Sequence, residues 1–232
     1  MIKRFAMFAA ACYCLASAPL CPAESWPEFI YPAEATAQVV AQDMVFNGIP
    51  MRVLTFQSKL SSDQMVKFYQ RRWKRHGAPE PALSKLGEWR IVGMMDGEYY
   101  KTAQVKAERD GSTGYLGISL GLKSIGKTKP VLGAGAPVPF GSVVRNDIYS
   151  VDLPKKARTV ILTNRQSVDF NLNYYLRHYQ GDGWGALMKK RVREPEHGAA
   201  LVFRKGVEEA SVAISEKNGQ TVVFLNTVGP AQ

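Results

Sequence analysis

The chain has 232 residues, with 30 Lys and Arg against 20 Asp and Glu, which gives a formal net charge of +10. A chain of this length can bury enough apolar surface to fold without disulfides. The positive excess favours acidic or anionic partners. No apolar run after residue 23 approaches the roughly 20 residues that a bilayer-crossing helix needs, so the sequence excludes such a span in the mature chain.

Residues 1–23 are predicted to be a secretory signal peptide. Lys3 and Arg4 precede an apolar run that is typical of such signals and, at about 15 residues, is too short for a membrane anchor. Cleavage after Ala23 predicts an exported, periplasmic chain. The three cysteines lie at positions 12, 14 and 21, so this cleavage leaves none. Retention of Cys21 as a lipid anchor would require a small residue before it, and Leu20 is not one.

Residues 24–37 combine prolines with aromatic residues, which predicts an extended arm rather than a helix. Residues 38–120 are predicted to form a first module. Asn47-Gly48 is a strong hairpin signal between two strands with apolar alternation. Turn residues and strand patterns place the strands of this module at residues 38–46, 51–57, 88–95, 98–109 and 114–120.

One helix is predicted between the second and third of these strands. Ser61 and Gln64 have the spacing of a capping box, in which a hydroxyl and an amide satisfy free backbone N–H groups. The helix places Met65, Phe68 or Tyr69, and Trp73 on one apolar face. Gly77 ends it, and the prolines that follow prevent continuation.

The stretch from Val39 to Gly77 has a second copy from Val143 to Gly183, which predicts a structural duplication. At the start of the copies, Asp43 matches Asp147 and Ile49-Pro50 matches Leu153-Pro154, at a separation of 104. Further on the separation is 106, and the matched positions are Ser61 with Ser167, Phe68-Tyr69 with Tyr174-Tyr175, Trp73 with Tyr179 and Gly77 with Gly183.

Residues 121–141 are rich in Gly, Pro and Lys and are predicted to link the two modules. The second module, residues 142–232, repeats the pattern of the first. Its helix is predicted over residues 168–180, and its strands over residues 142–151, 157–163, 199–204, 208–215 and 221–227. The expected fold class is α+β, with two related modules that each pack an antiparallel sheet of about five strands on one helix, in the order ββαβββ.

The linker contains a P-loop spacing, G-x-x-x-x-G-K-T, from Gly121 to Thr128. A functional P-loop requires a helix that starts directly after it, and Lys129-Pro130 followed by Gly-rich sequence predicts none. The same segment holds an S-x-x-K spacing from Ser124 to Lys127, which needs a rigid helix start to act as a serine acyl enzyme. Both matches are interpreted as features of a basic linker.

No catalytic residue, metal ligand or cofactor site is predicted. The three histidines are scattered without ligand spacing. The predicted mature chain has no cysteine nucleophile, and no serine or threonine has a local histidine and carboxylate. The chain is therefore interpreted as a non-enzyme, with an active site assembled from distant residues as the open alternative.

The candidate site is a basic surface. The first helix carries cations opposite its apolar stripe, and a second cluster follows the second helix, so the candidate anion-binding residues are Lys67, Arg71, Arg72, Lys74, Arg75, Lys189, Lys190 and Arg191. Arg71 and Arg75 lie one turn apart and could grip a carboxylate or phosphate. The alternative is a solvated helix face whose charges complement the helix dipole.

The predicted function is that of an exported binding or assembly factor of the bacterial cell envelope, accessory to a secretion or surface-appendage system. The expected partner is an acidic envelope protein or an anionic glycolipid or phospholipid surface, and not nucleic acid. The alternative is a periplasmic carrier that holds a lipid-like ligand in a cleft between sheet and helix. The residues that could line such a cleft are Trp73, Trp89, Met94 and Met95.

Overall fold

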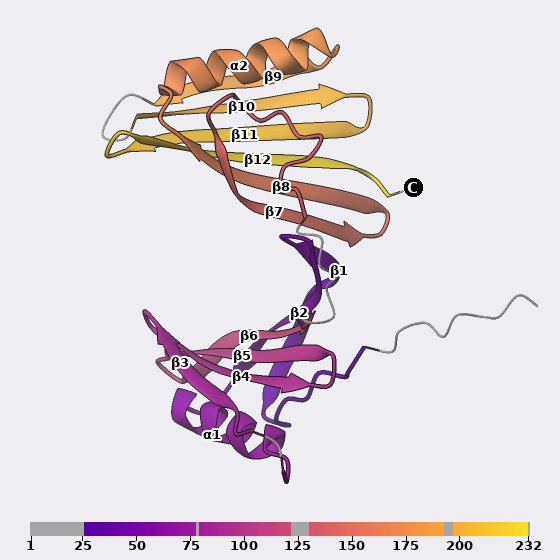
Figure 1. Cartoon of the computed structure of the whole chain (residues 1–232), viewed down its shortest axis with the longest axis vertical. Coiled ribbons are helices and arrows are strands. Elements are labelled where there is room, and N and C mark those ends of the chain that lie inside the picture. Colours follow the sequence, from indigo (N-terminus) through magenta and orange to yellow (C-terminus); the bar gives the residue numbers. More distant parts are fainter. Residues whose placement is uncertain (1–25, 78, 122–129, 193–196, 232) are drawn as a thin grey trace, which may run out of the picture.

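The computed structural model describes residues 26–77, 79–121, 130–192 and 197–231. Within these ranges the chain forms twelve strands and two helices, and neighbouring strands pair antiparallel. The strands join into one sheet, in the order β3-β4-β5-β6-β2-β1-β7-β8-β12-β11-β10-β9 (Figure 1). The α+β class agrees with the prediction.

Each half of the chain has the element order ββαββββ. The first half contains β1 (Ala35–Phe46), β2 (Ile49–Ser58), α1 (Ser62–Trp73), β3 (Ala82–Leu86), β4 (Trp89–Asp96), β5 (Tyr99–Glu108) and β6 (Gly111–Leu120). The second half contains β7 (Val143–Asp152), β8 (Lys155–Asn164), α2 (Val168–Gly181), β9 (Gly185–Val192), β10 (His197–Lys205), β11 (Glu208–Lys217) and β12 (Gln220–Pro230).

The prediction of two modules that each have their own sheet of about five strands is wrong, because two six-strand halves share one continuous sheet. β1 pairs with β7 over Asp43–Phe46 and Ile148–Val151. Asn47 extends this junction: its backbone N–H donates to the Asp147 carbonyl at 2.8 Å, and its side-chain oxygen accepts from the Asp147 N–H at 2.8 Å. The pairing of the two first strands satisfies backbone groups that would otherwise form two free edges.

β3 and β9 are the two strands that the sequence pattern did not predict. All five residues of β3 and all eight residues of β9 are exposed. A strand is recognised in sequence by the alternation of its buried and exposed residues, and neither segment has a buried face. Both become strands only through backbone pairing with β4 and β10.

The duplication predicted from the helices is confirmed. Ser61 and Ser167 are the N-caps of α1 and α2, and each side chain accepts a hydrogen bond from a backbone N–H three residues on. Tyr69 and Tyr175 are both fully buried. Gly77, with a φ of 76°, follows the first helix as Gly183, with a φ of 80°, follows the second.

The predicted match of the two first hairpins at a separation of 104 is wrong. Leu153–Pro154 forms the turn between β7 and β8, the place that Asn47–Gly48 holds between β1 and β2. The separation is therefore 106 here as well. Ile49–Pro50 matched Leu153–Pro154 in sequence only because each is an aliphatic residue before proline. Further upstream, the differing bulges of β1 and β7 move the structural equivalence to a separation of 108, because Val39 pairs with Leu54 as Asp147 pairs with Val160.

Each helix covers one face of its own half and encloses a separate core. α1 packs on β4, β5 and β6, and its buried side chains are Met65, Val66, Tyr69 and Trp73. α2 packs on β9, β10 and β11, and its buried side chains are Val168, Asn171, Leu172, Tyr175 and Tyr179. Among the described elements, the extensive contacts between halves run through β1 and β7.

The segment before each first strand is held on its half by equivalent arginines. In the first half, the Arg52 guanidinium lies 5.0 Å from the centre of the Trp26 ring, and Phe29 packs on the core. In the second half, Arg158 donates two hydrogen bonds to the Asp147 carboxylate, at 2.9 and 2.8 Å. The same carboxylate accepts the Gly133 N–H at 2.7 Å. The described part of the predicted linker thus occupies the place of the N-terminal arm.

The connection from the second strand to the helix also repeats its hydrogen bonds with different residues. The Ser58 hydroxyl accepts the Leu60 N–H at 3.1 Å, and the Leu60 carbonyl accepts the Ser112 hydroxyl at 2.7 Å. In the second half, the Asn164 side chain accepts the Gln166 N–H at 3.0 Å. The Gln166 carbonyl likewise accepts the Thr221 hydroxyl, at 2.6 Å.

Candidate functional site

The outer face of α1 carries the first group of predicted cations. Ser61 accepts the Gln64 N–H at 3.3 Å, and the Gln64 side chain accepts the Ser61 N–H at 2.8 Å, which confirms the predicted capping box. The rotation of the helix is set by its buried face. The five cations predicted for this helix are all exposed. Lys67, Arg71 and Arg72 lie on α1, whereas Lys74 is its C-cap and Arg75 follows it.

Two of these five cations already have acidic partners. Lys74 pairs with Glu80 at 2.6 Å, and Arg75 pairs with Asp96 at 2.6 Å. Burial alone would raise the pKa of the Asp96 carboxyl, but the hydrogen bond and charge of Lys101, with the charge of Arg75, outweigh it and hold this pKa below its usual value. Arg75 is thus directed toward the protein, and it does not form the predicted anion-gripping pair with Arg71.

The other three α1 cations face solvent. Lys67, Arg71 and Arg72 form no ion pair with any carboxylate in the described ranges. The Arg71 Nε donates to the Lys67 carbonyl at 3.3 Å, which leaves the rest of its guanidinium exposed. This face can therefore attract an anion without first breaking an internal pair.

The second group of cations lies on β9, at the edge of the sheet beside α2 (Figure 1). Arg191 is partly engaged, because its Nη2 donates to the Asp169 carboxylate in the first turn of α2 at 2.7 Å. Lys189 and Lys190 form no ion pair within the part of the chain that is described. β9 therefore presents two uncompensated charges on an open strand edge.

The two basic groups do not form one surface. α1 packs over β4, β5 and β6, whereas β9 is the last strand at the other end of the sheet. Figure 1 shows α1 and β9 at opposite ends of the molecule. The eight predicted anion-binding residues therefore belong to two separate sites, one in each half.

The four residues predicted to line an apolar cleft do not converge. Trp73 and Met94 are buried in the core under α1, with exposed fractions of 8% and 7%. Met95, next along β4, points to the opposite face and is 49% exposed. Trp89 packs against Tyr115, with ring centres 5.6 Å apart, on the face away from α1. β4 separates these side chains because successive residues of a strand point to opposite faces.

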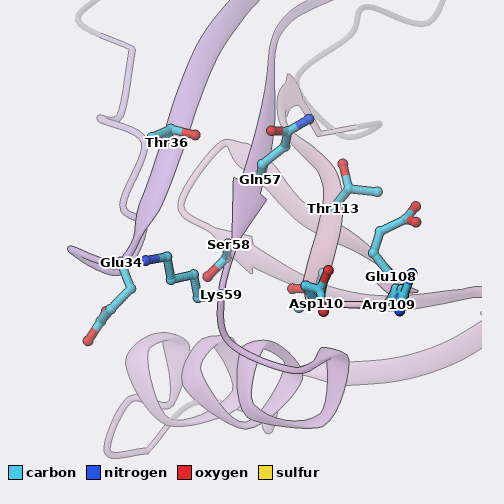
Figure 2. A pocket seen from close by; sticks show the side chains of 11 residues that line it. Glu34, Thr36, Gln57, Ser58, Lys59, Glu108, Arg109, Asp110 and Thr113 are labelled. Carbon is cyan, nitrogen blue, oxygen red and sulfur yellow. The ribbon is translucent and has the colours of Figure 1, made fainter.

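An open hollow of about 690 Å³, which the sequence did not predict, lies at the ends of β1, β2 and the β5–β6 turn. Figure 2 shows the side chains around it, which include Glu34, Thr36, Gln57, Ser58, Lys59, Glu108, Arg109, Asp110 and Thr113. A Cβ on Gly111 would lie 2.0 Å from the Ser58 carbonyl oxygen, so only glycine allows this close approach. The sequence predicted strands at residues 98–109 and 114–120, and hence a connection between them, but it did not predict that this connection lines a pocket.

The hollow has no composition that points to a particular ligand. Its three carboxylates and two cations alternate in sign around an open surface. Among the described residues, no three His, Cys, Asp or Glu side chains are grouped to hold a metal ion. Neither helix in the described ranges has the length and apolarity to cross a membrane.

Three predicted features lie outside the described residues. The signal peptide falls within residues 1–25, and the S-x-x-K spacing and all of the P-loop spacing after Gly121 fall on residues 122–129. Comparisons of the chain with models of known protein families, with curated proteins and with solved structures found no match.

Proposed function

We propose that the chain is an exported, non-enzymatic binding or assembly factor of the cell envelope, accessory to a secretion or surface-appendage system, that holds an acidic partner protein. The supporting observation is that Lys67, Arg71 and Arg72 on α1, and Lys189 and Lys190 on β9, form no ion pair with any carboxylate of the described chain. Such charges raise the rate and selectivity of association with a surface of opposite sign.

The charge distribution supports two sites rather than a diffuse positive field. The first half, residues 26–121, has 12 basic and 10 acidic residues, and the second half, residues 142–231, has 13 and 9. Neither half is strongly basic as a whole. Other described cations, among them Lys59, Lys85, Arg109, Lys155 and Lys217, also form no ion pair. What favours α1 and β9 is that each brings neighbouring exposed cations together, Lys67, Arg71 and Arg72 on α1 and Lys189 and Lys190 on β9.

An export signal supports the location. Residues 1–23 have the charged start, apolar run and small-residue end of a secretory signal. We propose cleavage after Ala23, which leaves a chain of net charge +8 without cysteine. Its partner would be an acidic protein of the envelope, because a protein partner can contact two sites at opposite ends of one sheet.

Binding to a defined polyanion tests the proposal. Wild-type protein without residues 1–23 is titrated into fluorescent poly-L-glutamate at low salt, and in parallel into phosphatidylglycerol vesicles. We expect binding to the polyanion that weakens as salt is raised, because exposed charges are screened. Reversing four charges, in Lys67→Glu, Arg71→Glu, Lys189→Glu and Lys190→Glu, should weaken it by about tenfold or more.

Arg177→Glu is the matched control for the helix substitutions. Arg177 is exposed on α2 at the position equivalent to Arg71, but it lies outside both proposed sites. It should leave binding within about twofold. Equal losses for Arg177→Glu and Arg71→Glu would contradict a localised site. Tight binding to vesicles without binding to poly-L-glutamate would replace the protein partner with an anionic lipid surface.

A further inference from the structure

The proposed function does not specify how a partner binds. β9, an exposed strand at the edge of the sheet, suggests a binding mode. We infer that β9 binds an extended acidic segment of a partner protein, which adds to the sheet as a further strand beyond β9. The inference rests on the proposed function, and it assigns the acidic partner a site, a backbone conformation and a residue pattern. The backbone would supply part of the affinity, and side chains would supply the choice of partner.

β9 has the backbone geometry that strand addition needs. It is eight residues long, and it pairs with β10 from Gly185 to Val192. No described strand lies on its other side. In an edge strand, the outward backbone N–H and C=O groups are a template for another extended chain.

The side chains of β9 define what can lie beside them. Lys189 is opposite Leu201 of β10, whose side chain is buried under α2, so Lys189 is on the helix side of the sheet. Met188, Lys190 and Val192 alternate with it and lie on the other side, where Met188 and Val192 are each 42% exposed. The edge therefore offers one lysine on each face, with apolar neighbours on the open face.

These positions predict the sequence of the added strand. Residues directly opposite each other on neighbouring strands share a face and interact, and opposite charges there are favourable. The bound segment should place carboxylates opposite Lys189 and Lys190 and apolar side chains opposite Met188 and Val192. An antiparallel segment with this pattern contains Val-Thr-Glu-Glu-Val, with Thr opposite Arg191, which Asp169 already engages.

The same charges disfavour a second copy of the chain at this edge. Two β9 strands pairing with each other would bring their lysines together, and like charges on neighbouring strands are destabilising. Lysine on an edge strand is a recognised protection against such pairing. An acidic strand removes the repulsion, so acidity is what distinguishes the partner from another copy.

The opposite edge of the sheet shows that these lysines are not required by the scaffold. β3 occupies the place of β9 in the first half, and its partners on β4 correspond in register to those of β9 on β10. Leu83 and Ser84 stand where β9 has Lys189 and Lys190. An edge strand of this fold thus forms without the cation pair, which makes the pair a property of β9 alone.

The test uses a synthetic peptide of about twelve residues built around Val-Thr-Glu-Glu-Val, with binding followed by fluorescence anisotropy. A second peptide has the same side chains, but alternate backbone nitrogens are methylated so that it cannot donate to β9. Against the wild-type protein, we expect the methylated peptide to bind at least about tenfold more weakly. If attraction between charges were the only interaction, the two peptides would bind with equal affinity.

Protein variants locate the binding. Lys189→Glu with Lys190→Glu should weaken the unmethylated peptide by about tenfold or more, whereas Lys67→Glu with Arg71→Glu on α1 should leave it within about twofold. Both double variants change the net charge equally. Circular dichroism of each variant shows whether it is folded, and the comparison of the two peptides does not depend on any variant.

The outcomes separate this inference from the proposed function. Equal affinity of the two peptides, or a loss caused by the α1 variant and not by the β9 variant, overturns strand addition while poly-L-glutamate binding still supports an acidic partner. Failure of the wild-type protein to bind the peptide, with poly-L-glutamate binding intact, overturns the inference alone. Failure to bind either probe overturns both.

Discussion

The two halves of the sheet have the same scaffold and present different surfaces. Equivalent serines cap their helices, and equivalent tyrosines fill their cores. The outer face of α1 is basic, whereas Arg177 and His178 are the only basic residues of α2. At the edge strands the second half is the more basic, because β9 has the pair Lys189 and Lys190 and β3 has Leu83 and Ser84 in their place. After duplication, packing positions stayed similar and exposed charges diverged, so each half offers a different contact.

The largest expected effect comes from deleting equivalent core side chains. Phe56 and Leu162 are 1% and 0% exposed, at equivalent positions of β2 and β8. Phe56→Ala and Leu162→Ala should each lower the free energy of unfolding of their own half by about 2–5 kcal/mol, through lost burial and a cavity.

Hydrogen exchange, read by mass spectrometry on peptides from each half, checks this. Protection should fall mainly in the altered half, because the halves have separate cores and meet through β1 and β7. Equal loss of protection in both halves would show that the sheet unfolds as one cooperative unit.

Asp147 gives the second half an acid sensitivity that its equivalent in the first half lacks. Hydrogen bonds from Arg158, and then from the Gly133 N–H, hold the pKa of the Asp147 carboxyl below its usual value against the opposing effect of burial. The equivalent residue of β1 is Val39, which pairs with Leu54 as Asp147 pairs with Val160, and it has no carboxylate.

A lowered carboxyl pKa stabilises the fold above the unfolded-state pKa of about 4, and this contribution is lost as pH falls through the lower folded-state pKa. Asp147→Asn should lower the free energy of unfolding by about 2 kcal/mol at pH 7 and by less at pH 3. Urea unfolding at both pH values measures the difference, and an unchanged loss at pH 3 would contradict it. The Asp147→Asn variant should still lose stability at low pH, because the pKa of the Asp96 carboxyl in the first half is also lowered.

A buried polar pair distinguishes the core of the second half from that of the first. The Asn164 amide donates to the Asn171 side chain at 2.8 Å, and Asn171 donates to Asn164 at 3.2 Å and to the Ser167 carbonyl at 3.0 Å. The equivalent residues in the first half are Ser58 and Met65. Asn171→Met should lower the free energy of unfolding by about 1–2 kcal/mol, because the Asn164 amide keeps its hydrogen bond to the Ser142 hydroxyl, at 3.0 Å, but loses the one to Asn171.

The double variant with Asn164→Ser and Asn171→Met copies the first-half pair into the second half. It should regain most of the stability lost in the single variant, since the amide N–H that bonded to Asn171 is then removed as well. Thermal unfolding of the single and double variants measures this. A double variant that is less stable than Asn171→Met would show that the pair is required by its surroundings.

The smallest expected effect concerns a property that the halves share. The Tyr69 and Tyr175 hydroxyls are buried without a hydrogen-bond partner in the described structure, and burial raises the pKa of both phenols. Tyr69→Phe and Tyr175→Phe should each be neutral or raise the free energy of unfolding by up to about 1 kcal/mol, because an unsatisfied buried hydroxyl is removed. Chemical denaturation measures it, and a loss above about 1 kcal/mol would point to an unseen partner for that hydroxyl.

The candidate sites were predictable only as residue types. The sequence showed that cations lie opposite the apolar stripe of α1 and that a basic cluster follows α2. It could not show that Arg75 turns toward Asp96, because these residues are brought together by packing of the helix end on the sheet. It also could not show that Lys189 and Lys190 lie on an edge strand, because β9 has no buried residue to mark it as a strand.

By itself, the sequence determined the α+β class, both helices with their serine caps, ten of the twelve strands and the duplication. Those features follow from local periodicity, capping and turns, which are set by residues close together along the chain. Tertiary structure alone decided that the halves share one sheet and that β3 and β9 form its edges. It also divided the cations between opposite ends, because pairing between distant strands depends on which backbone edges meet, and exposed residues leave no pattern that records it.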